Sequence, residues 1–468
     1  MNRWSDAGFV ACTVTRRALA VARWGVLAAA LALGVSSGAR AQTGLYFDEY
    51  GGDARSAAMG QAFTGIADNA AAAYYNPGGV GFAKAQTSLG FRYTNPNLGV
   101  RFRGERPDDV STDPESTQGM VISVLSDLDH PGLNKRFPWL EPLALGVEVF
   151  LPLPQVNSFG TFTSLSQVYF YRYDTRPDVL SLVFSLAYRI TDWLSIGGGF
   201  MPNFDSLQDN HANVRLNAPE DDPTMGTDLE LEQEATGTFT PLFGIVIKPP
   251  MESLRDVISL GISYRGRVKN YFGTGRSDQS VGLGLPDGSF FQLVYIRGEL
   301  VNFVGFVPEQ YSVGLGLHPS EKLTIGLDLT YKRFEDFTFW LDRPPDPRFQ
   351  NTLVPRIGVE YGIPMTGDIL GVGQLTNLKL RGGYYYEPSA NPTLSGPQNI
   401  VDNDQHVASV GIGLDTILMR KYSISYDLLF QAHILNPRRT KNSYDPLVPP
   451  FVADGQIFTT GFDVNFGW

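Results

Sequence analysis

The stretch QIFTTGFDVNFGW, from Gln456 to Trp468, decides the fold of this chain. Apolar residues alternate in it with small or polar ones, and it ends on an aromatic residue. The apolar set is Phe458, Phe462, Val464, Phe466 and Trp468, and the polar set is Thr459, Gly461, Asp463, Asn465 and Gly467. Alternation with a period of two predicts a β-strand with one apolar and one polar face.

The same alternation returns about a dozen times upstream, and each run has the length of about 9–11 residues that a tilted strand needs to cross a membrane. Leu323 to Tyr331 and Tyr422 to Phe430 are the clearest cases. Strands are predicted near 86–103, 118–127, 142–151, 178–189, 193–205, 237–248, 257–268, 308–318, 323–335, 352–361, 376–386, 405–415, 422–435 and 456–468. We therefore predict an all-β fold, a transmembrane antiparallel up-and-down β-barrel of about 14 strands, an even number as bacterial barrels require.

The links between these strands alternate in length, which fixes the orientation of the barrel. Short links such as Thr191–Asp192 and Pro319–Lys322 belong on the periplasmic side, and long links near 152–177, 206–236, 269–307, 336–351, 387–404 and 436–455 belong outside. A soluble sandwich or lipocalin-like barrel is the alternative, but its surface would need more charge than the 18% of charged residues in this chain. No apolar run reaches the about 18 residues of a transmembrane helix.

Residues 1–41 are predicted to be a secretory signal peptide. Arg16 and Arg17 precede an apolar run from Trp24 to Val35, and Ala39-Arg40-Ala41 provides a cleavage site. Export through the general secretion route to the outer membrane of a Gram-negative bacterium follows, since the rest of a twin-arginine motif is missing. The only cysteine, Cys12, lies in this segment, so no disulfide, thiolate metal site or cofactor is expected in the mature chain. The net charge of −11 also argues against nucleic-acid binding.

Residues 42–85 are predicted to form a helical hatch, and residues 86–468 the barrel. Ala54–Phe63 and Asp68–Tyr75 are rich in alanine, Asp68 is placed to cap a helix, and Asn76-Pro77-Gly78-Gly79 would end it. A barrel of about fourteen strands has a lumen too wide for its own side chains to fill. A compact helical segment before the first strand is therefore a natural plug.

These residues resemble the hatch of the FadL-type outer-membrane transporters of long-chain fatty acids and other hydrophobic compounds. The likeness is carried by Gly44–Glu49, Ala54–Phe63, Ile66–Ala70 and Tyr74–Gly79, and continues in Pro308–Gly314 and Leu380–Tyr384. The hatch motif falls on Asn76, Pro77 and Gly78, where Gly78 replaces the alanine of the family's motif. The terminal Trp468 stands where phenylalanine is usual.

The resemblance implies a fourteen-stranded barrel with a hatch that takes up apolar compounds passively, with a kink in the third strand as a lateral exit. Gly146 is the candidate for this lateral gate, because glycine marks bulges and Pro152 and Pro154 follow it. The alternative is that Gly146 is a small residue facing the lumen. Hydrophobic small molecules, outer-membrane lipid, lipopolysaccharide and the barrel-assembly machinery at the C-terminal strand are the expected partners of a monomer.

Two long links carry aromatic and apolar residues that are candidates for a ligand-collecting surface. They are Phe159, Phe162, Tyr169 and Phe170 in the first link, and Phe290, Phe291, Leu293, Tyr295, Phe303 and Phe306 in the second. The alternative is that these side chains pack loop against loop.

Four cations lie on the predicted lumen face of their strands: Arg189, Arg265, Lys332 and Arg381. They could bind a fatty-acid carboxylate or belong to an ion network of the lumen. The acidic stretch from Glu220 to Glu234 lacks the spacing of a calcium loop and is predicted to be a solvated outer loop.

An enzyme is not expected. The G-x-S-x-G at Gly34–Gly38 lies in the signal, and the five histidines show neither metal nor triad spacing. Besides the transporter, a structural or secretion-scaffold barrel of the PorV type, which shares the hatch signature, and a general porin stay open. An outer-membrane lipase whose serine and histidine meet only in space is a further alternative.

Overall fold

The computed structural model divides the chain into two compact units, residues 1–40 and 41–468. Only the second unit contains described residues, so the predicted signal segment lies outside them. Among the described residues, no helix is both long enough and apolar enough to cross a membrane. The structure describes residues 45–102, 116–128, 137–153, 157–158, 169–170, 172–173, 178–217, 225–284, 290–300, 303–338, 344, 347–369, 373–392, 400–418, 422–440 and 450–467.

Fourteen antiparallel strands close into a barrel, as the alternation predicts. The ring closes where β1 (Gln86–Phe102) pairs with β21 (Phe451–Gly467) along the whole length of both strands. The strands between them are β2 (Thr117–Asp127), β3 (Leu143–Leu153), β7 (Ser181–Thr191), β8 (Leu194–Asn217), β9 (Met225–Ile247), β10 (Ile258–Arg265), β14 (Glu309–Ser320), β15 (Leu323–Arg333), β16 (Thr352–Ile369), β17 (Gly373–Glu387), β19 (Gln405–Leu418) and β20 (Tyr422–Thr440).

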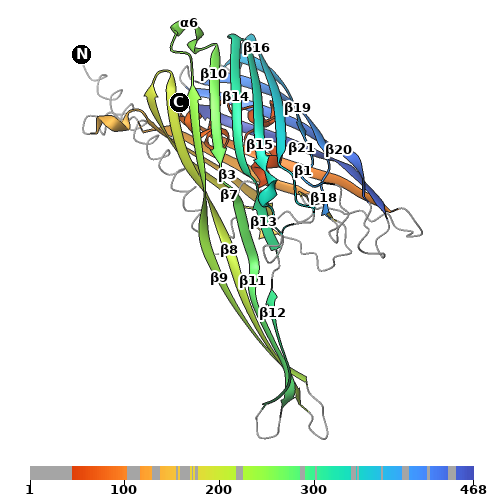
Figure 1. Cartoon of the computed structure of the whole chain (residues 1–468). Coiled ribbons are helices and arrows are strands. Elements are labelled where there is room, and N and C mark those ends of the chain that lie inside the picture. The colour runs from red at the N-terminus through yellow and green to blue at the C-terminus, as the bar shows by residue number, and fades with distance from the viewer. Residues whose placement is uncertain are drawn as a thin grey trace. The chain divides into compact units, whose positions relative to one another are not determined.

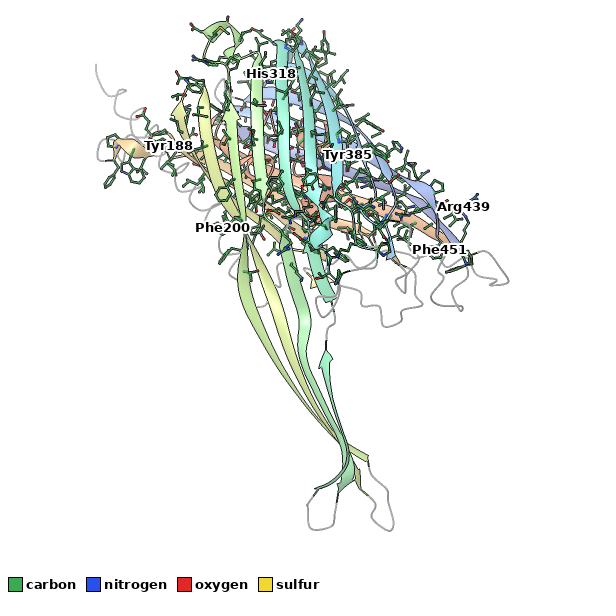
Figure 2. The ribbon with its side chains drawn as sticks, viewed as in Figure 1. Tyr188, Phe200, His318, Tyr385, Arg439 and Phe451 are labelled. Carbon is green, nitrogen blue, oxygen red and sulfur yellow. The ribbon has the colours of Figure 1, made fainter. Side chains whose placement is uncertain are left out.

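The apolar face of the strands points outward, away from the lumen. In β21, Phe458, Phe462 and Phe466 are exposed, whereas Thr459 and Asp463 between them are buried. Exposed apolar side chains occur on the other barrel strands as well, including the labelled Tyr188 and Phe200 (Figure 2). A barrel with an apolar exterior and a polar interior is the arrangement that lipid requires.

Two of the predicted long links are instead strands. The links expected near 206–236 and 269–307 contain the outer parts of β8 and β9, followed by β11 (Val268–Gly284), β12 (Phe290–Leu300) and β13 (Phe303–Val307). β8, β9, β11 and β12 continue beyond the rest of the barrel as a narrow extension (Figure 1). β11 pairs in parallel with β8, which is a contact between segments far apart in the sequence.

The acidic residues Asp228, Glu230, Glu232 and Glu234 accordingly belong to β9 and not to a loop, while Glu220–Asp222 lie outside the described residues. Two small strand pairs complete the sheet structure. β4 (Asn157–Ser158) pairs with β6 (Asp178–Val179), and β5 (Tyr169–Phe170) pairs in parallel with β18 (Ile400–Val401).

The hatch consists of short helices inside the barrel: α2 (Leu45–Tyr50), α3 (Ala54–Ala58), α4 (Ala72–Tyr75) and the 3-10 helix η1 (Pro77–Gly81). Three other short helices lie outside it: η2 (Pro138–Leu140), α6 (Glu252–Arg255) and η3 (Phe334–Asp336).

The prediction of a helix over Ala54–Phe63 is wrong beyond Ala58, because Gly60 and Gln61 have positive φ angles of 62° and 57°. Asp68 caps no helix. Asp53 does, and its carboxylate accepts a hydrogen bond from the Ser56 amide at 2.7 Å.

A charge placed on the outer face tests its contact with lipid. Leu327→Arg, near the middle of β15, is expected to reduce the free energy of unfolding by about 2–4 kcal/mol, because the guanidinium would face hydrocarbon. Leu353→Arg is the matched control, since Leu353 is exposed near the end of β16. There the cost should be about 0–1 kcal/mol. Equal costs at the two positions, measured by reversible denaturation in lipid vesicles, would contradict the membrane assignment.

Candidate functional site

Glycines on the inner face of the barrel allow the hatch backbone to contact the strand backbones directly. A Cβ atom at Gly383 would lie 2.0 Å from the Gly60 nitrogen, and one at Gly358 would lie 2.3 Å from the Met59 oxygen. Other barrel glycines that meet the hatch in this way are Gly197, Gly244, Gly261, Gly314, Gly316, Gly326 and Gly411. Any larger residue at these positions would push the hatch away from the wall.

Carboxylates of the barrel wall satisfy backbone donors of the hatch. Asp328 of β15 accepts hydrogen bonds from the amides of Phe63 and Thr64 at 2.9 and 2.7 Å. Asp463 of β21 accepts one from the Ala54 amide at 2.5 Å. These bonds supply partners that a longer helix would otherwise provide, so the hatch can consist of short helices and turns.

The Asn76-Pro77-Gly78 motif fixes the end of the hatch against β9. The Asn76 side chain donates to the carbonyl oxygens of Thr64 and Ile245 at 2.9 and 3.1 Å, and accepts from the Gly78 amide at 3.0 Å. Pro77 begins η1, where its missing N–H costs nothing. A Cβ atom at Gly78 would lie 2.8 Å from the Ile245 Cα atom, so glycine fits at this place and alanine would require a shift.

Three of the four predicted lumen cations lie inside the barrel and are paired. Arg265 contacts Asp48 of the hatch, Lys332 donates to Glu387 at 2.6 Å, and Arg381 bridges Glu360 at 2.6 Å and Asp427 at 2.5 Å. Burial raises the pKa of Asp48 and the charge of Arg265 lowers it, and the net shift is downward. Arg189 differs from the other three, because its side chain is exposed near the end of β7.

Sequence analysis missed Arg172, which lies between β5 and β6. Its guanidinium is 2.7 Å from the Glu387 carboxylate, 2.8 Å from that of Asp402 and 4.0 Å from that of Glu49 in the hatch. β5 and β18 lie in two of the long links, and their parallel pairing brings this segment to the opening of the barrel on the side of those links, here called the mouth. No periodicity marks such a residue, because its partners are distant in the sequence.

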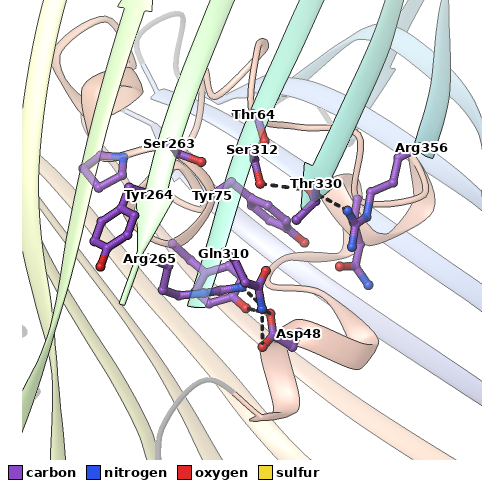
Figure 3. Close-up of a pocket in the computed structure, with 13 residues that line it drawn as sticks. Asp48, Thr64, Tyr75, Ser263, Tyr264, Arg265, Gln310, Ser312, Thr330 and Arg356 are labelled. Atoms are coloured by element: carbon purple, nitrogen blue, oxygen red, sulfur yellow. Dashed lines mark hydrogen bonds and ion pairs between the residues drawn. The ribbon is translucent and has the colours of Figure 1, made fainter. Parts of the chain in front are cut away.

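A polar cavity of about 40 Å³ lies between the hatch and the wall (Figure 3). This volume holds a few water molecules at most. The hatch lines it with six residues: Asp48, Gln61, Thr64, Tyr74, Tyr75 and Pro77. The lining residues of the wall are Ser263, Tyr264, Arg265, Gln310, Ser312, Thr330 and Arg356.

Arg356 is the second residue that sequence analysis missed. It is 9% exposed, donates to the Thr330 hydroxyl at 2.7 Å and lies 5.2 Å from the Tyr385 ring. Its Nε atom has no hydrogen-bond partner, and no carboxylate among the described residues forms an ion pair with it. The cavity therefore contains one guanidinium, Arg265, that contacts the Asp48 carboxylate. The other, Arg356, contacts no carboxylate among the described residues, and the charges of Asp328 and Glu387 act on it from farther away.

The family follows from a match over almost the whole chain. A family model described as "Outer membrane protein transport protein (OMPP1/FadL/TodX)" matches residues 36–466. This chain belongs to the FadL/TodX family. The members are outer-membrane channels for hydrophobic compounds in Gram-negative bacteria, and the family consists of transport channels rather than enzymes.

Solved structures agree with the fold. A FadL homologue from Pseudomonas aeruginosa is 14% identical, with 88% of this chain and 96% of that chain covered and a TM-score of 0.50. A deletion mutant of the TodX monoaromatic hydrocarbon channel is 15% identical, with 90% and 100% covered and a TM-score of 0.50. At these identities the likeness supports the fold alone. No curated protein sequence matches this chain.

In this FadL/TodX family member, two of the predicted ligand-contacting aromatics are buried. Phe306 packs with Phe334, Phe337 and Phe349, and the rings of Phe337 and Phe349 stack at 4.5 Å. Phe170 is 1% exposed. In the structure described here, both side chains therefore pack within the mouth and do not form an exposed collecting surface.

The remaining aromatic candidates cannot be placed as side chains. Phe159 and Phe162 lie outside the described residues, and only the backbone is described for Tyr169, Phe290, Phe291, Leu293, Tyr295 and Phe303.

Gly146 does not interrupt the third strand. It pairs with Leu125 of β2 and with Ser185 of β7, and neither ladder shifts its register there. A Cβ atom at Gly146 would lie 3.0 Å from the Ala73 Cβ atom. In this structure Gly146 is thus a small lumen residue against which the hatch packs, and the strand has no bulge there.

Gly78→Ala tests the docking of the hatch. The added methyl group meets backbone atoms of β9, so we expect a loss of stability of about 1–3 kcal/mol from overpacking. Gly382→Ala is the matched control, because a Cβ atom at Gly382 meets nothing within 4 Å. The measurement is the thermal unfolding of both variants in detergent. Equal stability would show that Gly78 does not limit the approach of the hatch.

Proposed function

We propose that this chain is a passive outer-membrane channel for hydrophobic compounds that carry a carboxylate, with long-chain fatty acids as the substrate class. The observation that carries this proposal is Arg356, a buried guanidinium beside a polar cavity with no carboxylate partner among the described residues. Asp328 and Glu387 offset part of this charge from a distance, but neither carboxylate contacts the guanidinium. A ligand carboxylate would lower the remaining cost of the buried charge through bidentate hydrogen bonds.

The apolar part of such a ligand has a suitable surface just beyond the end of β15, where η3 begins. Thr330 lines the cavity, and Phe334 of the aromatic cluster follows four residues later. Strand geometry separates these positions by roughly 10–13 Å. A ligand carboxylate at Arg356 would therefore direct an alkyl chain of about this length toward the rings of Phe306, Phe334 and Phe337. The chain would enter between these rings when they move apart.

Aromatic hydrocarbons are the second candidate class, since the same four phenylalanines could receive a ring without any charged partner. Solved structures described as TodX monoaromatic hydrocarbon channels have the same fold. A hydrocarbon would leave Arg356 unpaired, so the carboxylate class is preferred. A general porin is disfavoured, because the hatch contacts the inner wall through many strands.

We place a lateral exit at the seam between β3 and β7, and not at Gly146. The ladder between these strands ends at Phe150 and Ser181, whereas β3 continues to pair with β2 as far as Leu153. In the described part of the seam, residues 151–153 therefore pair on one side only. β6 contacts β3 beside this seam but forms no ladder with it. Separation of the two segments would break no ladder hydrogen bonds and would let an apolar ligand leave sideways into lipid.

Arg356→Met tests the substrate class. We expect the apparent affinity for radiolabelled oleate to fall by about 10–100-fold, corresponding to a charged hydrogen bond of about 1.5–3 kcal/mol. Uptake of toluene should not change. Both solutes are measured in cells that express the variant or the wild type, compared with cells that lack the protein.

Arg439→Met is the control, because Arg439 is exposed on β20 and does not line the cavity. An equal loss for oleate and toluene would contradict the role of Arg356. No gain of either solute with the wild type would favour the PorV-type scaffold, and a gain of small polar solutes would favour the porin.

A further inference from the structure

Three polar side chains form a row across the inner wall of the first three strands. Ser88 of β1 pairs with Ser123 of β2, and Ser123 pairs with Glu148 of β3. Their exposed fractions are 2%, 0% and 0%. None of their side-chain oxygens has a hydrogen bond of ordinary length and angle among the described residues, but the Ser123 hydroxyl lies near enough to the Glu148 carboxyl group to act on it as a donor. A fully buried carboxyl group without an ordinary hydrogen bond is rare and requires an explanation.

The carboxyl group of Glu148 lies directly against the hatch. A Cβ atom at Gly52 would be 2.5 Å from the Glu148 Oε1 atom. Gly52 lies between α2 and α3, next to Asp53, which caps α3. Any change in the charge of Glu148 therefore acts on the segment that joins these two helices.

The charged and titratable groups around Glu148 are mostly acidic. Asp53 and Tyr75 face it from the hatch, Arg92 from β1 and Asp463 from β21. Its strand partners Ser123 and Val183 bring no charge. Arg92 is already engaged, since its guanidinium donates to both Asp463 oxygens at 2.5 and 2.9 Å and to the Gly52 carbonyl at 3.1 Å.

Arg92 thus faces three buried carboxyl groups, and Arg55 of the hatch is a second cation that acts on one of them, Asp53. Burial and, next to it, the charge of Asp463 raise the pKa of Asp53 against the opposing charge of Arg55. An ionised Glu148 would add one more charge without an ordinary hydrogen bond. Desolvation and repulsion both act against that state.

We propose that Glu148 is a proton-sensitive latch: its neutral carboxyl group permits the closed hatch, and its ionisation weakens the docking of residues 51–58. The closed hatch favours the protonated form, whereas an opened hatch exposes the group to water with the ordinary pKa of about 4.3. Stability of the closed hatch is therefore complete below this pH and is lost as the pH rises above it. Because one proton is involved, the equilibrium constant for docking of the hatch falls by at most tenfold per pH unit. This inference adds regulation to the proposed transport, but it does not depend on the ligand.

Hydrogen exchange of peptide 51–58, measured by mass spectrometry on the full chain in lipid nanodiscs, tests the latch without any transport assay. After correction for intrinsic exchange, the protection of the wild type should fall between pH 4.5 and 8. Glu148→Gln should match the wild type at pH 4.5, because glutamine resembles the neutral acid, and should be at least tenfold better protected at pH 8. Glu141→Gln is the control, since Glu141 is exposed just before β3.

Asp53→Asn provides an independent variant, because asparagine keeps the helix cap and removes one neighbouring charge. Asp53→Asn should raise the protection of peptide 51–58 at pH 8. The further gain in protection from Glu148→Gln should be smaller in the Asp53→Asn background than in the wild type. Protection at pH 8 that stays at the wild-type value in both single variants would overturn the proposal. So would a gain of equal size in Glu141→Gln.

Discussion

The close approach between the hatch backbone and the backbone of the barrel strands is the constraint on which the rest of this structure depends. Glycine at positions such as Gly358 and Gly383 removes the side chains that would keep the two apart. At that distance, wall carboxylates such as Asp328 can reach the hatch amides. The hatch thereby exchanges internal helical hydrogen bonds for bonds to the wall, so its conformation is defined only inside the barrel.

This arrangement also explains the distribution of charge in the lumen. Carboxylates that accept hydrogen bonds from hatch amides need cations nearby, and Arg92 forms an ion pair of this kind with Asp463. Arg381 does the same for Glu360, which in turn binds Arg55 of the hatch at 2.9 Å. Each pair is buried, so removal of one partner would leave an uncompensated charge. Arg356 and Glu148 are exceptions to this pairing, and both lie next to the hatch.

The sequence was sufficient to predict the strands because their signal is local. Alternation in segments such as Leu323–Tyr331 depends only on which face meets lipid, so all fourteen ring strands and the polarity of both faces could be predicted. Helix ends in the hatch could not, because the positive φ angles of Gly60 and Gln61 have no clear local signature. The parallel pairing of β8 with β11 and the position of Arg172 depend on contacts between distant segments, which no local pattern predicts. Alternation could place Arg356 on the lumen face, but it could not predict that no carboxylate of the described residues contacts its guanidinium.

The cavity between the hatch and the wall is too small for a hydrophobic ligand. About 40 Å³ cannot hold a solute larger than a few waters, so passage requires the hatch, the mouth or both to move. The hatch is not held equally on all sides. Toward β9, β10 and β14–β16 it meets many glycines and accepts or donates hydrogen bonds, as at Asn76 and Asp328, although one Asp328 oxygen and the Arg356 Nε atom have no partner among the described residues. Toward β1–β3 it faces Ser88, Ser123 and Glu148, whose buried oxygens have no ordinary hydrogen bonds among the described residues. Water entering on that side would gain hydrogen bonds at once, so a passage that opens between the hatch and the first three strands would be hydrated from the start.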